Sequence, residues 1–338
     1  MESLEEEVDR IAAETSFSGV VRVDRGDEIE LAKAYGLAHR GLEVANTPDT
    51  QFAVASAVKS MTALTVVSLI VDGTLDLSTT AREVLGTDLL LVDDAVTIEH
   101  LMAHRSGIGD YLHEDIEHDY DDYLMPIGVN QLATTEQFLA VLDGFPTKFP
   151  AGEQFSYCNG GFMVLALIAE RASGVDFHDL VQQRVCEPAG MIDTAFLRSD
   201  ELPGRAALGY LEVDGVWRSN VFHLPVRGNG DGGIYTTVAD VRSLWLAFFD
   251  GRIVPQEWVA EMVRPHSVIS DNERYGFGFW LDGSGEAVRM EGCDTGVSFR
   301  SWHHPTPRLT HTVIANDMDG AWPMTKALYA RLSGPLVS

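Results

Sequence analysis

The stretch QFAVASAVKSMTAL, residues 51–64, places a lysine three positions after a serine, where an apolar segment begins. The chain has four lysines, and Ser56-Ala-Val-Lys59 is the one serine–lysine pair with this spacing. In a helix, residues three apart share a face, so the Lys59 ammonium can approach the Ser56 hydroxyl. A serine hydroxyl is a weak nucleophile that needs a neighbour to accept its proton. The stretch therefore indicates either an activated serine or a helix cap followed by a lysine with a buried stem.

The residues after this pair predict a buried helix. Residues 61–71 are apolar on almost every side, which is typical of a helix inside a domain, and Gly73 is expected to end it. At the N-terminus of a helix, unpaired backbone N–H groups and the helix dipole favour negative charge. A tetrahedral oxyanion formed at Ser56 would therefore be stabilised by its position.

A second segment, FPAGEQFSYCNGG at residues 149–161, carries a tyrosine and an asparagine just before another apolar helix. A tyrosinate near Lys59 can act as general base, because the cation favours the ionised phenol. Asn159 can donate its amide to an acyl carbonyl or contact Lys59. The alternative is structural: Tyr157 packs on the helix and Asn159 caps it.

Composition limits the class of protein. The chain has 338 residues, 45% of them hydrophobic and 22% charged, as in ordinary globular proteins. Its net charge of −27 disfavours nucleic acids and anionic membranes as partners. The acidic N-terminal sequence lacks the features of a signal peptide, and the most apolar helical stretch is shorter than the roughly 20 residues that span a bilayer. We therefore expect a cytoplasmic protein with no nucleic-acid or membrane partner; the oligomeric state stays open.

The order of predicted elements indicates an α+β fold. Helices are expected over residues 3–14, 56–72, 97–104, 135–142, 160–172, 177–186, 237–249 and 323–332, and strands over 19–23, 28–34, 275–281, 287–290, 296–303 and 309–315. Strands at both ends with helices between them predict one antiparallel sheet built from both termini and flanked by helices. We expect residues 1–75 and 235–338 to form this sheet domain, and residues 76–234 to form a mostly helical insert that carries substrate loops.

Several segments, in order along nearly the whole chain, resemble the serine β-lactamase and D,D-peptidase superfamily, on its class C branch with related esterases. Besides Ser56-x-x-Lys59 and Tyr157-x-Asn159, the matching segments are residues 61–77, 96–108, 149–153, 186–194 and 232–240. Ordered segments at sensible spacing are far more specific than any single motif. The resemblance implies the β-lactamase/transpeptidase-like fold.

The resemblance also implies a mechanism. Ser56 would be acylated by a carbonyl substrate, Tyr157 with Lys59 would move protons, and water would hydrolyse the acyl-enzyme. The family's oxyanion hole uses two backbone N–H groups, which by position would be those of Ser56 and Cys293, aimed where negative charge develops. No cofactor is implied, and the partner is a small ester or amide.

The third family motif is where this sequence departs. The family's edge strand usually carries Lys-Thr-Gly or His-x-Gly, and the matching triplet here is Met290-Glu291-Gly292. Gly292 keeps the close approach that a substrate needs. The cation that would pair with a substrate carboxylate is absent, and Glu291 stands beside its place. We therefore expect weak turnover of β-lactams and a preference for neutral or cationic esters and amides, provided that Glu291 faces the pocket.

The predicted function is a serine hydrolase of carboxylesterase, amidase or D-peptidase type. An acyltransferase would use the same acyl-enzyme, and a penicillin-binding-like protein could be acylated without turning over. A cluster of acidic and histidine residues at positions 113–119 could suggest a metal site, but its histidines are five apart, not four. We expect no metal.

Overall fold

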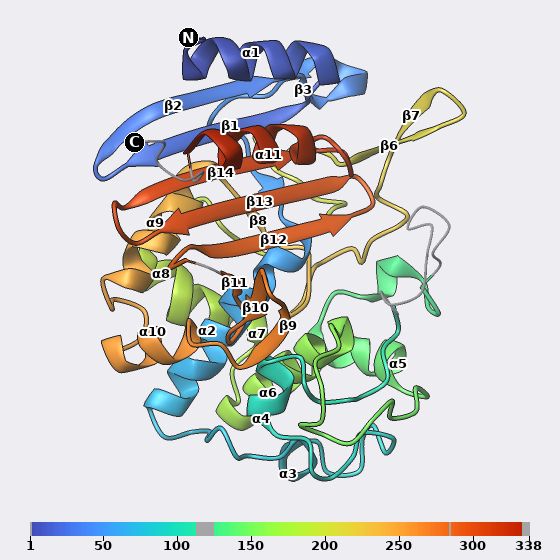
Figure 1. The fold of residues 1–338 in the computed structure, drawn as a ribbon. Coiled ribbons are helices and arrows are strands. Elements are labelled where there is room, and N and C mark those ends of the chain that lie inside the picture. Colours follow the sequence, from blue (N-terminus) through green and yellow to red (C-terminus); the bar gives the residue numbers. More distant parts are fainter. Residues whose placement is uncertain (1, 113–124, 284, 333–338) are drawn as a thin grey trace.

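The computed structural model describes residues 2–112, 125–283 and 285–332 (Figure 1). In this part of the chain, eight strands form one antiparallel sheet in the order β2-β1-β14-β13-β12-β11-β10-β9. Their bounds are β1 Gly19–Arg25, β2 Glu28–Tyr35, β9 Ser267–Ser270, β10 Glu273–Tyr275, β11 Trp280–Asp282, β12 Val288–Asp294, β13 Val297–His304 and β14 Leu309–Ala315. The predicted α+β fold, with strands from both ends of the chain in one sheet, is confirmed.

Two helices from opposite ends of the chain cover one face of the sheet. Helix α1 (Leu4–Thr15) begins with the predicted capping box, in which Ser3 and Glu6 bond each other's backbone N–H groups. Together with α11 (Ala321–Leu332), it buries apolar side chains of β1, β2 and β14. Figure 1 shows both helices lying over this end of the sheet.

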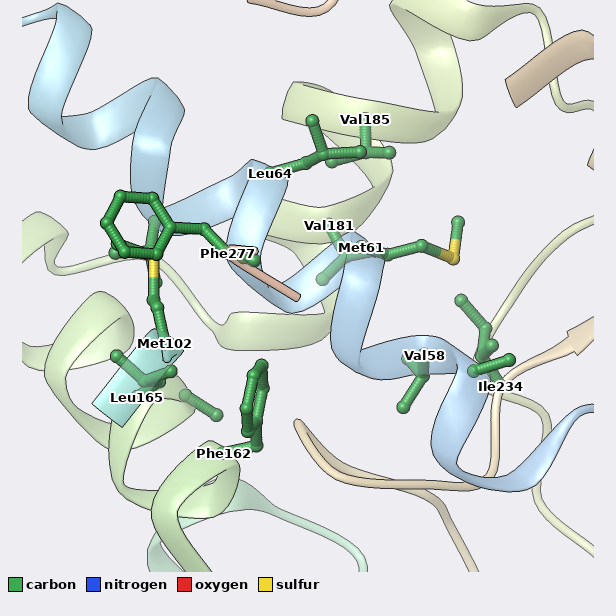
Figure 2. Close-up of a cluster of buried hydrophobic side chains, with 14 of the residues drawn as sticks. Val58, Met61, Leu64, Met102, Phe162, Leu165, Val181, Val185, Ile234 and Phe277 are labelled. Atoms are coloured by element: carbon green, nitrogen blue, oxygen red, sulfur yellow. The ribbon is translucent and has the colours of Figure 1, made fainter. Parts of the chain in front are cut away.

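The other face packs on a larger apolar core. Helices α2 (Val58–Val71) and α9 (Val238–Phe249) contribute to it, and α6 (Asn159–Ser173) packs beside α2. Every residue of α2 from Val58 to Leu69 is buried, as predicted from its apolar sequence. Figure 2 shows side chains of α2 and α6 in this core, together with those of neighbouring segments.

The remaining elements are short and mostly lie between α2 and α9 along the chain. They are α3 Ala81–Leu85, α4 Ile98–Met102, α5 Leu139–Leu142, α7 Phe177–Val181, α8 Glu187–Ala189 and α10 Gln256–Met262, with the small hairpins β3 Leu37–His39 with β4 Val44–Ala45, β5 Phe52–Ala53 with β8 Tyr235–Thr236, and β6 Tyr210–Val213 with β7 Val216–Ser219. No described helix is both long enough and apolar enough to cross a membrane. The division into a sheet domain and an insert stays a prediction.

One predicted strand is two strands in the structure. The single strand expected over residues 275–281 is a hairpin, β10 and β11, which turns through Gly276 and Gly278. Gly278 has a φ of +77°, and a Cβ on it would lie 2.6 Å from that of Ala63 in α2. The turn therefore needs glycine both for its backbone conformation and for its close packing.

Candidate active site

Ser56 lies in one short turn that leads into α2. Residues Ala55–Ala57 form a 3-10 turn, and Val58 begins the α-helix. Ala55 has a φ of +45°, a left-handed conformation that is costly for a residue with a Cβ. This sharp turn presents Ser56 at the N-terminal end of the helical segment, where the sequence predicted it. Ser56 and Lys59 still lie about one helical turn apart, because the 3-10 turn continues directly into the α-helix.

Lys59 is 2% exposed and makes three hydrogen bonds from its ammonium. Nζ lies 2.9 Å from Ser56 Oγ, 2.8 Å from Asn159 Oδ1 and 2.8 Å from the backbone oxygen of Asp231. A buried ammonium is costly unless such acceptors surround it. The predicted Ser56–Lys59 contact therefore exists, and Lys59 links three distant segments of the chain.

Asn159 is held on two sides. Its side-chain oxygen accepts from Lys59, so its Nδ2 is the group that can donate to a substrate carbonyl. The Asp110 carboxylate accepts from the backbone N–H groups of Asn159 at 2.6 Å and of Gly160 at 2.9 Å. A carboxylate at a helix N-terminus is favourable, although burial raises the pKa of Asp110. Asp110 thus caps α6 and fixes the start of the helix that carries Asn159.

Tyr157 lies beside Lys59 in a cluster of aromatic rings. Its ring centre is 5.1 Å from Lys59 Nζ, within the range of a cation–π contact. The ring stacks on Trp280 at 5.9 Å with an interplanar angle of 14°, and it lies 4.3 Å from the His104 ring. The structure therefore places the Tyr157 ring beside Lys59, whose Nζ contacts Ser56 Oγ.

Strand β12 approaches the Ser56 turn along an uncovered edge. Strand β11 pairs with Val288 and Arg289 of β12, and no described strand pairs with the rest of β12 on that side. A Cβ on Gly292 would lie 2.1 Å from Val54 O and 2.9 Å from Ser56 N. Glycine is therefore required at position 292 by packing against the protein's own backbone, and the predicted approach of a substrate at Gly292 stays a prediction. Cys293 follows it and lines the cleft, in keeping with the predicted oxyanion position.

The structure does not support Glu291 as a pocket residue. It is absent from the described cleft lining, and its carboxylate forms ion pairs with Arg289 and Arg300. Neighbouring residues of a strand face opposite sides, so Glu291 points away when Gly292 faces the Ser56 turn. The expectation that Glu291 repels anionic substrates is therefore corrected.

A cleft of about 1030 Å³, counted with its open mouth, lies over Ser56. Apolar side chains, among them Phe138, Met163 and Leu224, form part of its lining. Its described lining contains two aspartates, Asp231 and Asp294, and no lysine or arginine. The carboxyl groups that line this wall therefore belong to residues other than Glu291.

Asp231 is buried and bonded to a tyrosine. The Tyr111 hydroxyl donates to Asp231 Oδ2 at 2.6 Å. Burial raises the pKa of Asp231, while the charge of Lys59 and the bond from Tyr111 act in the opposite direction. Burial and the neighbouring carboxylates hold the pKa of Tyr111 well above its usual value, so Tyr111 stays protonated and donates. Sequence reasoning missed both residues, because they lie in loops with no periodic pattern.

No group of three or more histidine, cysteine, aspartate or glutamate side chains in the described ranges could hold a metal ion. The histidine and acidic cluster at residues 113–119 lies outside the described residues. Nothing in the geometry of Ser56 and Lys59 requires a metal, since the amine already contacts the hydroxyl.

Comparison with known proteins agrees with this geometry. The chain matches the family described as beta-lactamase over residues 4–334. A solved penicillin-binding protein from Bacillus halodurans is 32% identical, with a TM-score of 0.91 over 96% of this chain and 100% of that one.

Two further relatives carry enzyme names. A D-aminopeptidase of Brucella anthropi is 27% identical over 90% of this chain and 56% of its own length. A D-amino acid amidase from Ochrobactrum anthropi, 22% identical over 98% of each chain with a TM-score of 0.79, shares the fold. The chain spans 56% to 63% of the length of the curated relatives it matches. From its sequence, its fold and its serine–lysine geometry, the chain belongs to the β-lactamase family.

Proposed function

We propose that this protein is a serine hydrolase that forms an acyl-enzyme at Ser56. The observation that carries the proposal is the 2.9 Å contact between Lys59 Nζ and Ser56 Oγ in a cleft that is open to solvent. Membership of the β-lactamase family and the position of Tyr157 beside Lys59 support it.

In the proposed reaction, Ser56 Oγ attacks the carbonyl carbon of an ester or amide, and its proton passes to the Lys59–Tyr157 pair. The backbone N–H groups of Ser56 and Cys293 stabilise the oxyanion of the tetrahedral intermediate. Collapse of this intermediate breaks the bond to the alcohol or amine, which leaves with the proton. Water then attacks the acyl carbonyl, gives its proton to the same pair, and releases the acid and free Ser56.

The charge of the cleft supports a neutral or cationic substrate. Asp231 and Asp294 line it, and its described lining contains no lysine or arginine. Two charges about 4 Å apart interact by roughly 4 kcal/mol near a protein surface, so a carboxylate on the substrate would be disfavoured. A substrate ammonium would be attracted. β-Lactam antibiotics that carry a carboxylate should accordingly be poor substrates.

The name of the Brucella relative, D-aminopeptidase, makes amides and esters of D-amino acids the first compounds to test. Three p-nitroanilides of equal core isolate the effect of charge: D-alanine p-nitroanilide, its N-acetyl form and its N-succinyl form carry positive, zero and negative charge. We expect kcat/KM to be highest for the free amine and lowest for the succinyl compound. Nitrocefin and the L-alanine series complete the panel.

Ser56→Ala should abolish hydrolysis of every compound in this panel, while Ser270→Ala, which removes an exposed hydroxyl far from Ser56 in sequence, should leave it unchanged. Intact-protein mass spectrometry should show a transient acyl adduct on wild type and none on Ser56→Ala. Turnover that persists in Ser56→Ala would refute the proposed nucleophile. Faster hydrolysis of nitrocefin than of the neutral and cationic compounds would refute the proposed substrate class.

The same experiment separates the alternatives. An acyltransferase would give ester product when an alcohol is added, and a protein that is acylated without turnover would keep its adduct for hours. The predicted cytoplasmic location stays a prediction, which cell fractionation would test.

A further inference from the structure

His104 lies directly behind the loop that carries Tyr157. It follows α4, is fully buried, and has a φ of +53°. The left-handed conformation is uncommon for residues other than glycine, although histidine, asparagine and aspartate adopt it more readily than most. Such a conformation in a buried residue calls for a reason in its contacts.

Those contacts reach both sides of Tyr157. The backbone oxygen of His104 accepts from the Ser156 N–H at 2.9 Å. Its ring Nδ1 accepts from the Cys158 N–H at 3.1 Å. Its ring also lies 4.3 Å from the Tyr157 ring, with an interplanar angle of 33°. One residue thus holds the peptide N–H before Tyr157, the peptide N–H after it, and the side chain between them.

The protonation state of His104 follows from these bonds. Because Nδ1 accepts, the neutral ring carries its hydrogen on Nε2. Burial, with the charges of Lys59 and Lys148 nearby, holds the pKa of His104 well below its usual value, so the ring stays neutral. Nε2 has no hydrogen-bond partner among the described residues. The ring therefore has no route by which to relay a proton from Ser56.

The filling of space alone does not account for the choice of histidine at position 104. A buried donor without a partner costs about 1–3 kcal/mol, and a leucine would fill the space without that cost. What a leucine lacks is an acceptor for the Cys158 N–H combined with a flat face for the Tyr157 ring.

We propose that His104 is a positioning residue, which fixes the Tyr157 ring beside Lys59 by holding the backbone on both sides of it. The inference rests on the proposed function, because the position of Tyr157 matters for the reaction only if Tyr157 and Lys59 move protons. His104 itself touches neither Ser56 nor the substrate in this scheme. Its effect is on geometry, and a displacement of about 1 Å can lower a rate about 100-fold.

Three substitutions of His104 separate the effect of its Nδ1 acceptor from the effect of its ring. His104→Asn tolerates the left-handed backbone and keeps an acceptor near the place of Nδ1, but it loses the ring. His104→Phe keeps a ring and loses the acceptor. His104→Ala loses both. His303→Phe is the matched control, because His303 is also a buried histidine in an aromatic cluster, stacked on Trp245 away from Tyr157.

The first readout is kinetic. With a neutral p-nitrophenyl ester, we expect kcat to fall about tenfold in His104→Asn and His104→Phe and about 100-fold in His104→Ala, with KM changed less than twofold. Rates are taken well below each variant's melting temperature and are expressed per folded molecule. His303→Phe should lower the melting temperature without changing kcat. Unchanged kcat in folded His104→Ala, or a rise in KM alone, would overturn the proposal.

The second readout does not depend on activity. Hydrogen exchange of the peptide that contains Ser156 to Cys158 should be faster in His104→Phe and His104→Ala than in wild type, and close to wild type in His104→Asn. Unchanged exchange in all three would overturn the proposed hold on the backbone. If wild type hydrolyses no ester while exchange behaves as expected, the proposed function fails and the contact of His104 with this loop stands.

Discussion

Two parts of the cleft differ in how completely their polar groups are bonded. One is the reactive end, with Ser56, Lys59 and Asn159. The other is the part of the lining that contains His223, Asn229 and Asp231, here called the facing wall. At the reactive end, Lys59 has three hydrogen-bond acceptors, and Asp110 holds the backbone of Asn159. On the facing wall, the side-chain oxygen and nitrogen of Asn229 have no hydrogen-bond partner among the described residues, and neither does Nδ1 of His223. In the first region the protein itself holds Lys59 and Asn159, whereas in the second the side chains of Asn229 and His223 have atoms to which a ligand can bond.

This difference suggests that the two parts of the cleft have different roles: the reactive end carries out the reaction, and the facing wall selects the substrate. Groups that react must be held before substrate arrives, because their geometry sets the rate. Groups that recognise a substrate gain specificity when the substrate supplies their missing hydrogen bonds, since a wrong substrate leaves them buried and unpaired. Changes at the reactive end should therefore lower kcat, and changes on the facing wall should alter KM and substrate preference.

The largest effect is expected from Lys59→Met, which replaces the ammonium by an uncharged chain of similar length. Removal of the ammonium takes away the charge that favours an ionised Tyr157 as the base for Ser56, so kcat should fall about 1000-fold, within the usual range for loss of general acid–base catalysis. Hydrolysis of a neutral p-nitrophenyl ester measures this. The comparison between the two regions would fail if kcat stayed within tenfold of wild type while KM rose.

Asp231→Asn tests the selection side. The backbone oxygen that binds Lys59 is retained, but the negative charge is lost. The ratio of kcat/KM for D-alanine p-nitroanilide to that for its N-acetyl form should fall about tenfold, which corresponds to about 1.4 kcal/mol. A ratio equal to that of wild type would show that Asp231 does not recognise charge.

The pH profile sharpens this test. Burial raises the pKa of Asp231, so its carboxylate takes up a proton at a higher pH than an ordinary aspartate. As pH falls through that raised pKa, the attraction for a substrate ammonium is lost. The cationic-to-neutral ratio should therefore decrease toward low pH in wild type and stay flat in Asp231→Asn. A flat ratio in both proteins would contradict the prediction.

Asn229→Leu should separate binding from stability. The leucine removes an unpaired buried amide, so the free protein should gain about 1 kcal/mol in its free energy of unfolding. The same change removes hydrogen bonds to the substrate, so KM should rise several-fold while kcat changes little. Urea unfolding and steady-state kinetics measure the two quantities. A fall in stability together with unchanged KM would show that the amide is satisfied within the protein.

The smallest effect is expected from Glu291→Gln. Its carboxylate pairs with Arg289 and Arg300 and lies outside the described cleft lining. The charge preference of the three p-nitroanilides should stay within twofold of wild type, and stability should change by less than about 1 kcal/mol, as is usual for partly exposed ion pairs. A clear gain in hydrolysis of the succinyl compound would restore Glu291 as a determinant of specificity.

The sequence predicted most of the sheet, but not β9, and it predicted the Ser56–Lys59 pair, because these leave local signals. Alternating and continuous apolar runs mark the strands and α2, and the spacing of Ser56 and Lys59 is that of one helical turn. The facing wall leaves no such signal. Asp231 and Asn229 lie in a loop, and their relation to Ser56 is set by long-range packing that no local pattern records.

Glu291 also shows what a local sequence pattern cannot predict, here for a single residue. The sequence located the strand and its essential glycine, but the face on which each side chain lies depends on register. Gly292 faces the Ser56 turn, where a Cβ would not fit, and Glu291 consequently turns toward the arginines. A pattern that is correct to one residue can still assign a charge to the wrong side of a sheet.

The pairing of β1 with β14 has a consequence for biosynthesis. Gly19 is opposite Ala315, so this junction of the sheet joins a segment made early in translation to one made near its end. Contacts between residues so distant along the chain form slowly, because the entropy of closing a large loop is lost before the contacts stabilise the fold. The β1–β2 hairpin therefore has no partner along β1 until β14 has been synthesised, near the end of translation. A chaperone that shields exposed strand edges should raise the yield of folded protein more than one that acts on helices.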